Sequence, residues 1–446
     1  MHANVMLSMC EFVKYLMYFK VIYMYVLYMR AQVQFSIQRN DRGSIDIGLY
    51  AVNSQQTVDT KYCHIQHRLV NDILKQVRYF LAKNSDISIY NPAKRVGSLC
   101  HLVIRAGFQS NEAMVCLVSN TRYKDLVSKR AGGIPEGAKV KRGSRGNISN
   151  NNGGSGSSSS SESSLSMSHL QSLTESLSTV PGVKCVLYNY NPSPMDADIL
   201  GDEKAERTRL LFGESEFIHD SVAGVRVRVS LLSFMQSNPL QAEVLYRKVA
   251  ELAAFTGNET VLDLYCGVGT ISLFVAPLVR NVIGVEDCAA AVVDAMENKR
   301  INSIDNVDFI CGKAEDVLSV GVTLPSGSVT DSIIVDEKLD LSSSSSLSSG
   351  SSAPDMWEAM SDDVVAICNP PRKGCEQRLL DALVERAVRK IVYVSCNPKT
   401  LARDLDVLIR NGYSLKKVCP VDMFPHTTHV EVVCLLISSA SETAVV

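Results

Sequence analysis

The sequence predicts an α/β protein in which a smaller α+β domain with an antiparallel sheet precedes a largely parallel, doubly wound sheet. Two patterns lead to this prediction. Before residue 238, short alternating apolar runs such as AQVQFSI, SIDIGLYAV and LCHLVIRAG indicate strands, with one helix pattern among them at about residues 69–81. After residue 238, strand and helix patterns alternate along the chain, which is typical of a parallel sheet covered by helices.

The second half begins with a helix signal at Asn238 and Pro239, because asparagine is a favoured N-cap and proline fits the first helical turn. We expect strands at residues 260–264, 282–285, 307–310, 364–368 and 391–394, helices from 271 and at 289–300, 376–389 and 399–410, and closing strands at 415–418 and 430–436. Only a short connection separates the two closing strands, which indicates an antiparallel end to the sheet.

Composition places the chain among globular proteins that work inside the cell. Its 446 residues exceed one ordinary core, and 46% hydrophobic with 21% charged residues is an ordinary balance. The net charge of −2 gives no sign of general nucleic-acid binding, although a local basic face is compatible with it. Thirteen cysteines without a CxxC pair indicate reduced thiols. We expect an intracellular monomer outside the membrane; nucleus, cytoplasm, chloroplast and mitochondrion are not distinguished.

Changes of composition divide the chain into segments. Two Gly/Ser-rich tracts cannot bury enough apolar surface to fold and are expected to be disordered. The apolar run at residues 21–29 is about half of a membrane span. The expected segments are an atypical apolar N-terminus (1–29), an α+β domain (30–237) with an insertion at about 139–170, an α/β domain (238–438) with an insertion at about 322–356, and a tail (439–446).

The segment VLDLYCGVGTISL ends one strand and opens the next helix. Gly267 and Gly269 let the backbone approach a ligand closely, and Asp263 stands four residues before Gly267. A D-x-x-x-G-x-G loop of this kind is the usual one for S-adenosylmethionine. Tyr265 lies in the same loop, and Glu286, at the end of the next strand, is placed to accept hydrogen bonds from ribose hydroxyls. A loop for another nucleotide or a structural turn is the alternative.

Three further segments lie at the boundaries of predicted strands and carry reactive side chains. Cys396 directly follows an apolar strand, and ligands in open α/β sheets bind at such carboxyl ends. A thiol there can act as a nucleophile, although a buried cysteine can also be simply a small apolar residue. Asn369 and Arg372 lie in NPPRKG, and FPHTTHVE supplies His429 and Glu431, together with His426. A carboxyl group that leads into an apolar strand is a candidate proton acceptor.

The segments SFMQSN, DLYCGVGTISL, NPPRKG, VSCNPKTLARDL and FPHTTHVE occur in this order. They resemble the motifs of the RNA 5-methyluridine methyltransferases, which modify uridine in transfer and ribosomal RNA. Weaker similarity reaches back to about residue 30. The resemblance implies a Rossmann-like class I methyltransferase domain, S-adenosylmethionine as methyl donor and RNA as partner.

The resemblance also implies a covalent mechanism. Cys396 would add to C6 of uracil and so activate C5 toward the methyl group, after which Glu431 would remove the C5 proton. It further implies that the methyl donor contacts Gln236, Asp263, Tyr265, Gly267, Gly269, Glu286 and Asn369, and that Asn369, Arg372 and His429 contact the substrate.

The chain departs from the family pattern in three places. The usual motif reads Asp-Pro-Pro-Arg, whereas this chain has Asn369, whose amide can accept from uracil N3–H and also donate to O4. Many members hold an iron–sulfur cluster on four cysteines; only Cys63 matches a ligand here, so we expect no cluster and no other metal. The small N-terminal barrel of many members is absent from this sequence. We therefore expect an N-terminally shortened member, and the Ser-rich insertions suggest a eukaryotic source, with a plant as one candidate.

Two other functions are compatible with parts of the sequence. An amino-group methyltransferase, for example one acting on N6 of adenine, would use the Asn369-Pro-Pro motif but would have no use for Cys396. A protein that keeps the fold and binds RNA without turnover is the non-enzyme alternative, and Asn369 is the residue that suggests it.

Overall fold

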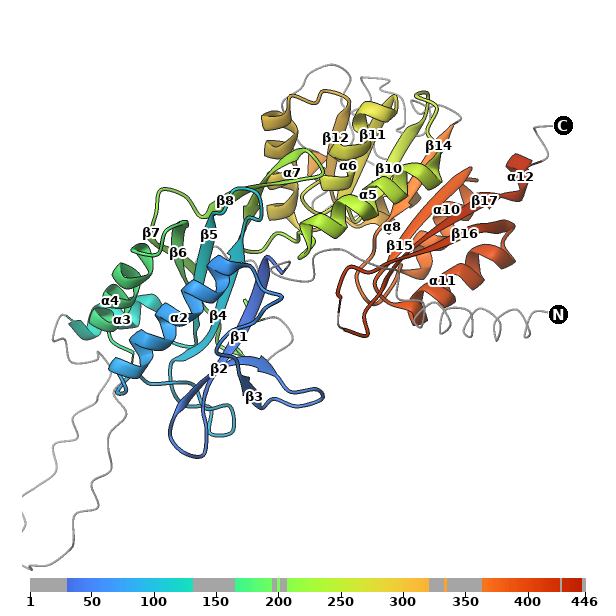
Figure 1. Cartoon of the computed structure of the whole chain (residues 1–446). Coiled ribbons are helices and arrows are strands. Elements are labelled where there is room, and N and C mark those ends of the chain that lie inside the picture. Colours follow the sequence, from blue (N-terminus) through green and yellow to red (C-terminus); the bar gives the residue numbers. More distant parts are fainter. Residues whose placement is uncertain are drawn as a thin grey trace, which may run out of the picture.

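The computed structural model describes residues 30–130, 165–194, 199–200, 207–320, 333–334, 363–425 and 427–442. The predicted N-terminal segment (1–29), nearly all of both predicted insertions, His426 and the last four residues of the predicted tail lie outside the described residues. Figure 1 shows the blue-to-green first half beside the yellow-to-red second half, each built around its own sheet.

The first half contains a seven-stranded sheet. Its order is β3-β2-β1-β4-β5-β6-β7. Neighbouring strands are antiparallel, except β5 and β6, which run parallel. The strands are β1 (Gln32–Arg39), β2 (Ile45–Tyr50), β3 (Thr57–Asp59), β4 (Leu99–Ala106), β5 (Ala113–Ser119), β6 (Val183–Tyr190) and β7 (Thr208–Phe212). The predicted antiparallel α+β domain is therefore a mixed sheet, because the chain crosses over between β5 and β6.

Helices cover one face of this sheet. They are α2 (Arg68–Lys83), α3 (Tyr123–Arg130) and α4 (Met167–Ser178). Helix α2 buries one stripe of apolar side chains, as its sequence pattern predicts, and the His67 side chain caps it by accepting from the backbone N–H of Leu69. Helix α4 begins inside the range predicted as a disordered insertion (139–170). That prediction extends too far, because Leu170, Leu173 and Leu177 give this Ser-rich stretch an apolar face that is buried.

A separate hairpin joins the two halves. Strands β8 (Phe217–Val222) and β9 (Val225–Ser230) pair only with each other among the described strands. The buried side chains of β9 share one apolar core with strands of the first sheet and with helices of the second half. The predicted α+β domain (30–237) thus ends in an element that packs on both halves.

The second half is an eight-stranded sheet, and its order, β13-β12-β11-β10-β14-β15-β17-β16, confirms the predicted Rossmann-like α/β class. All neighbours are parallel except those of β17, which runs antiparallel to β15 and β16. The strands are β10 (Thr260–Leu264), β11 (Asn281–Glu286), β12 (Val307–Cys311), β13 (Ile333–Ile334), β14 (Val364–Cys368), β15 (Lys390–Ser395), β16 (Tyr413–Val421) and β17 (Glu431–Ser438).

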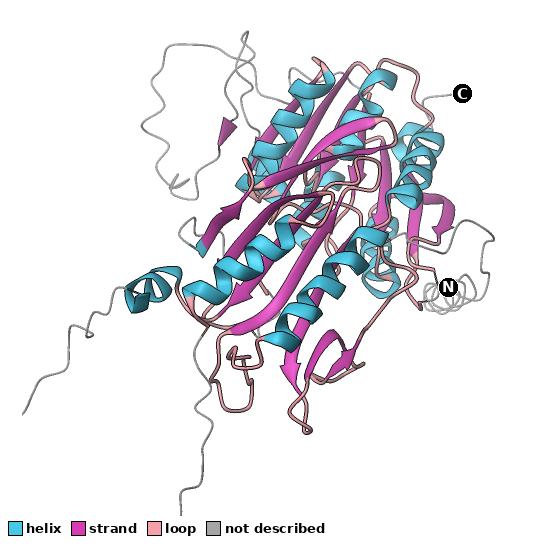
Figure 2. Ribbon diagram, turned by 60° about the vertical axis from the view of Figure 1, so that its left-hand side comes forward, coloured by secondary structure: helices cyan, strands magenta, loops and turns pink. Residues whose placement is uncertain are grey.

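Helices lie on both faces of this sheet (Figure 2). They are α5 (Pro239–Ala253), α6 (Thr270–Val275), the short helix η2 (Ala276–Leu278), α7 (Ala289–Asn302), α8 (Ala314–Val320), α10 (Gln377–Glu385), α11 (Pro398–Arg410) and α12 (Ser439–Glu442). Helix α12 is one short turn that lies within the residues predicted as a tail (439–446). Asn238 caps α5 as predicted, since its side chain accepts from the backbone N–H of Gln241 at 3.2 Å.

The strand order reverses between β10 and β14. From β10 the chain builds outward through β11 and β12, then returns to add β14 and β15 on the other side. At such a switch point the connections leave in opposite directions, so a crevice opens at the carboxyl ends of the strands. The topology therefore fixes where a ligand binds.

One buried carboxylate ties the hairpin to the first sheet. Asp220 in β8 is 4% exposed and accepts hydrogen bonds from the backbone N–H groups of Phe108 and Gln109, each at 2.8 Å, and of Ser110 at 3.3 Å. These residues form the turn between β4 and β5. The Asp220 carboxylate thus provides a hydrogen-bond acceptor for three backbone N–H groups that lie outside the strand pairing.

We predict that Asp220→Ala lowers the free energy of unfolding by about 2–4 kcal/mol, because several charge-assisted hydrogen bonds are lost and buried donors remain unpaired. Urea denaturation measures the change. The control is Glu243→Ala, which removes an exposed ion pair with Arg247 and should change stability by less than about 1 kcal/mol. Equal effects of the two substitutions would contradict the assigned role of Asp220.

Candidate active site

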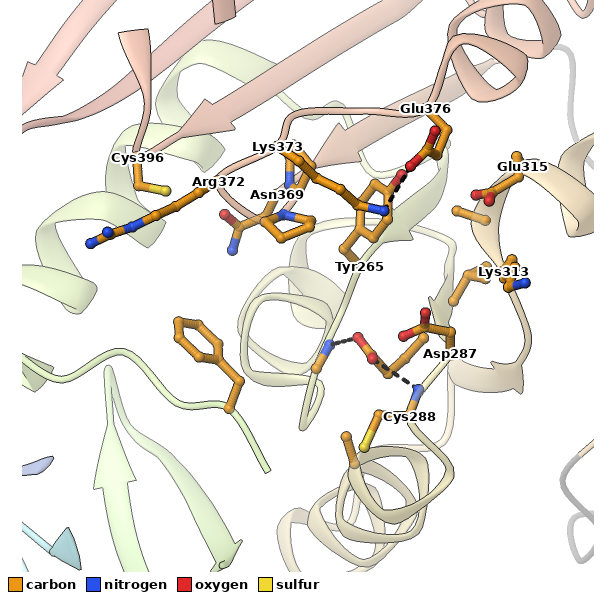
Figure 3. A pocket seen from close by; sticks show the side chains of 18 of the residues that line it. Tyr265, Asp287, Cys288, Lys313, Glu315, Asn369, Arg372, Lys373, Glu376 and Cys396 are labelled. Carbon is orange, nitrogen blue, oxygen red and sulfur yellow. Dashed lines mark hydrogen bonds and ion pairs between the residues drawn. The ribbon is translucent and has the colours of Figure 1, made fainter. Parts of the chain in front are cut away.

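A cavity of about 550 Å³ opens at the carboxyl ends of the central strands, at the switch point. Its wall brings together eight of the residues predicted from the sequence, namely Gln236, Tyr265, Gly267, Glu286, Asn369, Arg372, Cys396 and Glu431. In Figure 3, Cys396 and Arg372 lie at one end, Asp287, Cys288 and Lys313 lie at the other, and Asn369 and Tyr265 lie between them. The cavity has the size of a small-molecule site.

The loop after β10 and the end of β11 form one wall. The Glu286 carboxylate accepts from the backbone N–H of Gly267 at 2.9 Å and from that of Cys288 at 3.0 Å, and Figure 3 draws both bonds. Burial raises the pKa of Glu286 to about 7, although these two hydrogen bonds favour the ionised form. A carboxylate oxygen can accept more than one hydrogen bond, so Glu286, which lines the cavity, can still accept from the hydroxyl groups of a ligand.

Two residues predicted to contact the cofactor lie behind this loop and not in the cavity wall. Asp263 is fully buried and accepts from Ser272 Oγ at 2.5 Å, and burial raises the pKa of its carboxyl to about 7. Gly269, at φ 77°, begins helix α6, and a Cβ there would lie 2.5 Å from the Phe309 ring. Asp263 and Gly269 therefore support the loop after β10 from its buried side and do not face the cavity.

Strand pairing sets Cys396 beside Glu431. Ser395, the last residue of β15, pairs with Val432 on β17. Cys396, which directly follows β15, and Glu431, the first residue of β17, therefore become neighbours at the cavity. Burial raises the pKa of Glu431 to about 7, with Arg372 acting in the opposite direction. Burial and the Glu431 carboxylate raise the pKa of the Cys396 thiol, while the positive charge of the nearby Arg372 guanidinium lowers it. The thiol of Cys396, the carboxyl group of Glu431 and the guanidinium of Arg372 thus influence one another electrostatically.

The loop that carries Gln236 is held by both halves of the protein. The backbone N–H of Ala31, just before β1, donates to the carbonyl of Ser237 at 2.9 Å. On the other side, Asn238 Nδ2 donates to the carbonyl of Met423 at 3.1 Å. Gln236 itself is 7% exposed and faces the cavity. The first sheet therefore helps to build the site although no residue of that sheet lines it.

Asn369 and His429 differ in their placement. The backbone N–H of Asn369 donates to the carbonyl of Leu264 at 3.2 Å, and in Figure 3 the Asn369 side chain lies between Tyr265 and Cys396. His429 is exposed and does not line the cavity; its ring lies 6.2 Å from that of Phe424, centroid to centroid. Through Phe424, a cavity residue, His429 supports the wall indirectly.

The sequence interpretation missed several lining residues. Phe234 stands two residues before Gln236 in the same loop, and Lys313 and Glu315 follow β12. The rule that ligands bind at strand ends, when applied to β12 as it was to β10 and β14, identifies the latter two. Lys373 and Glu376 form an ion pair at 2.6 Å across the cavity wall. No sequence signal distinguishes that pair from an ordinary exposed one.

Within the described residues, no three His, Cys, Asp or Glu side chains gather as a metal site, and Cys63 is a free thiol. In the same part of the chain, every helix is too short or too polar to traverse a bilayer.

Comparison with known proteins identifies the family. The sequence model described as tRNA (uracil-5-)-methyltransferase matches residues 194–321 and 361–439. The chain is 34% identical over 407 residues to a protein of Clostridium tetani described as an uncharacterized RNA methyltransferase, covering 91% of this chain and 70% of that protein. A protein of Halalkalibacterium halodurans with the same description is 35% identical over 395 residues, which are 88% of this chain and 68% of the relative.

A solved structure has the same fold. The crystal structure of Pyrococcus abyssi tRNA (uracil-54, C5)-methyltransferase in complex with S-adenosyl-L-homocysteine aligns with a TM-score of 0.59 and 24% identity, over 93% of this chain and 77% of that one. On the strength of the sequence relatives and the family match, this chain belongs to the tRNA (uracil-5-)-methyltransferase family of RNA methyltransferases.

Proposed function

We propose that the protein transfers a methyl group from S-adenosylmethionine to C5 of a uridine in RNA, through a covalent bond between Cys396 and C6. The observation that carries the proposal is the placement of a thiol and a carboxyl group on neighbouring strands, at the end of the cavity opposite the Gly267–Glu286 loop. That arrangement is suited to a nucleophile and a base acting on one ring.

The residues at the far end of the cavity fit the methyl donor. Glu286 can accept from ribose hydroxyls, and Gly267, at φ 56°, leaves space for a close approach, because a Cβ there would meet only the Phe234 carbonyl oxygen at 3.6 Å. Gln236, Tyr265 and Asn369 extend this surface toward Cys396. When bound, S-adenosylmethionine supplies an electrophilic methyl group.

The residues at the near end fit the chemistry of uracil. Carbon C5 of uracil is a weak nucleophile, and addition of the Cys396 thiolate to C6 places an enolate electron pair on C5 and O4. C5 then forms the bond to the methyl group, the methyl–sulfur bond of the donor breaks, and S-adenosylhomocysteine is the leaving group. Glu431 removes the C5 proton, and the C6–S bond breaks to restore the ring double bond and the thiolate. Arg372 stabilises the thiolate before the addition and after the elimination.

Two side chains can orient the base. Phe234 is 64% exposed although it lines the cavity, so its ring is open for stacking with an unpaired base. The Asn369 amide can accept from N3–H and donate to O4, where negative charge develops on addition. A flipped-out uridine is thereby read along one edge and held on one face.

We predict that Cys396→Ala abolishes the covalent adduct with RNA that contains 5-fluorouridine, because the sulfur that bonds C6 is lost. Glu431→Gln should instead accumulate a methylated adduct on unmodified RNA, since no group removes the C5 proton. Denaturing electrophoresis of labelled RNA detects both species. Cys419→Ala, at a partly buried thiol on β16, is the control and should retain adduct formation.

The same assay separates the alternatives. Methylated adenine without any adduct would favour an amino-group methyltransferase that uses Asn369. Cofactor binding with neither product would identify a protein that binds RNA without turnover.

We predict that release of the methylated uridine from Cys396 depends on pH through Glu431, because only the carboxylate accepts the C5 proton. As pH falls through about 7, the raised pKa of Glu431, this form is lost. The rate of product release should then fall by roughly tenfold per pH unit. Single-turnover rates from about pH 5.5 to about pH 8.5 measure it. Adduct formation with 5-fluorouridine needs no C5 proton removal, so an identical pH profile for both reactions would argue against Glu431 as the base.

We predict that Glu286→Gln weakens binding of S-adenosylhomocysteine by roughly 10- to 100-fold, the loss expected for one or two hydrogen bonds to a charged acceptor. Isothermal titration calorimetry measures the Kd. Glu297→Gln, which alters an exposed ion pair with Arg300, is the control. An unchanged Kd for Glu286→Gln would show that this carboxylate does not hold the ribose.

A further inference from the structure

The turn that carries Arg372 rests on helix α11, the helix that begins just after Cys396. The carbonyl of Arg372 accepts from Asn397 Nδ2 at 2.8 Å and from Thr400 Oγ1 at 3.2 Å. Asn397 is the N-cap of α11, and its side chain also accepts from the backbone N–H of Lys399. The first turn of α11 therefore holds the backbone of Arg372 by two hydrogen bonds, and the side chain of Arg372 lies near the Cys396 thiol.

A buried carboxylate one turn further along α11 holds the rest of this turn. Asp404 is fully buried, and its Oδ2 accepts from the backbone N–H of Cys375 at 2.8 Å and from the Tyr393 hydroxyl at 2.6 Å. Its Oδ1 accepts from Arg403 Nε at 2.7 Å. Tyr393 lies on β15, so the carboxylate also joins the helix to the strand that ends at Cys396.

Arg403 extends the contact from the carboxylate to the turn. Its Nη2 donates to the carbonyl of Lys373 at 2.9 Å and to that of Cys375 at 3.1 Å. Between these residues, Gly374 has φ 80°, and a Cβ there would lie 2.5 Å from Asp404 Oδ2. The backbone thus lies directly on the carboxylate, and only glycine fits at the point of contact.

We propose that Asp404 is a positioning residue for the methyl-transfer reaction: with Arg403 it locks the turn at residues 372–375 onto α11 and so holds the Arg372 guanidinium beside Cys396. The inference rests on the proposed role of Cys396 as nucleophile. Because Cys396 immediately precedes α11, a single helix sets the distance between the thiol and its cation.

The groups that face the thiol show why this distance matters. Glu431 on β17 disfavours the thiolate, whereas Arg372 and the N-terminus of α11 favour it. If the turn at residues 372–375 loses its hydrogen bonds to α11, Arg372 can move away from the thiol, while the Glu431 carboxylate still destabilises the thiolate. The thiolate fraction then falls, and with it the rate of addition to C6.

The experiment measures the Cys396 thiol directly in the full-length protein. Alkylation by iodoacetamide is followed over pH by mass spectrometry of the peptide that contains Cys396. For Asp404→Asn we expect the midpoint to rise and the rate near neutral pH to fall by roughly tenfold, equivalent to about one pH unit. The rate of adduct formation with 5-fluorouridine RNA should fall in parallel, while the Kd for S-adenosylhomocysteine stays within about twofold, since Asp404 does not line the cavity.

The direction in which the alkylation midpoint of Cys396 moves in Asp404→Asn distinguishes a positioning role of Asp404 from a direct effect of its negative charge. Removal of a nearby negative charge favours the thiolate and would lower the midpoint. Asp406→Asn is the matched control on the same helix; Asp406 forms a surface ion pair with Arg410, and its loss should leave midpoint and adduct rate unchanged. Thr400→Val removes one hydrogen bond to the Arg372 carbonyl with little change of shape, and should shift the midpoint in the same direction by less. It keeps the test valid if Asp404→Asn does not fold.

A rise in the midpoint for Asp404→Asn or Thr400→Val, with cofactor affinity retained, supports the positioning role. An unchanged or lowered midpoint in the folded variants overturns it. Failure of the wild-type protein to form any adduct would instead overturn the proposed function.

Discussion

The antiparallel pairing of β17 with β15 is the constraint on which the site depends. The strand pairs β10–β11, β10–β14 and β14–β15 are all parallel, so these strands bring only their carboxyl ends to the cavity. Because β17 runs the other way, its first residue, Glu431, meets the end of β15 and lies beside Cys396. The same pairing buries the Glu431 carboxyl group, and burial raises its pKa to about 7. One backbone register therefore both places Glu431 beside Cys396 and increases its affinity for a proton.

The two halves of the protein are coupled through this site and not merely adjacent. The hairpin β8–β9 shares an apolar core with both sheets, and the loop that follows it carries Gln236. That loop is hydrogen-bonded to Ala31 on one side and to Met423 on the other. A displacement of the first sheet would therefore move a wall of the cavity.

Much of this architecture was predictable, because strand ends in a doubly wound sheet carry the functional loops. That rule found Glu286, Asn369 and Cys396, which the structure brings to one cavity. It could not show that Asp263 and Gly269 lie on the buried side of the loop, since a motif does not specify which side of a turn a side chain takes.

Helix α4 was missed because serine dominates its composition, although the four-residue spacing from Leu173 to Leu177 places both side chains on one buried, apolar face. The contacts of Asp404 join residues far apart in sequence, and no local pattern reveals them.

Strand β17 follows β16 in the chain but lies between β15 and β16 in the sheet, and β16 has no other strand neighbour in the described fold. During synthesis, the cofactor loop and the thiol can form while β16 is still without a place to pair. Only the docking of these two strands brings Glu431 to the cavity. A growing chain would therefore form the Gly267 loop and place Cys396 at its strand end before the carboxyl group joins them.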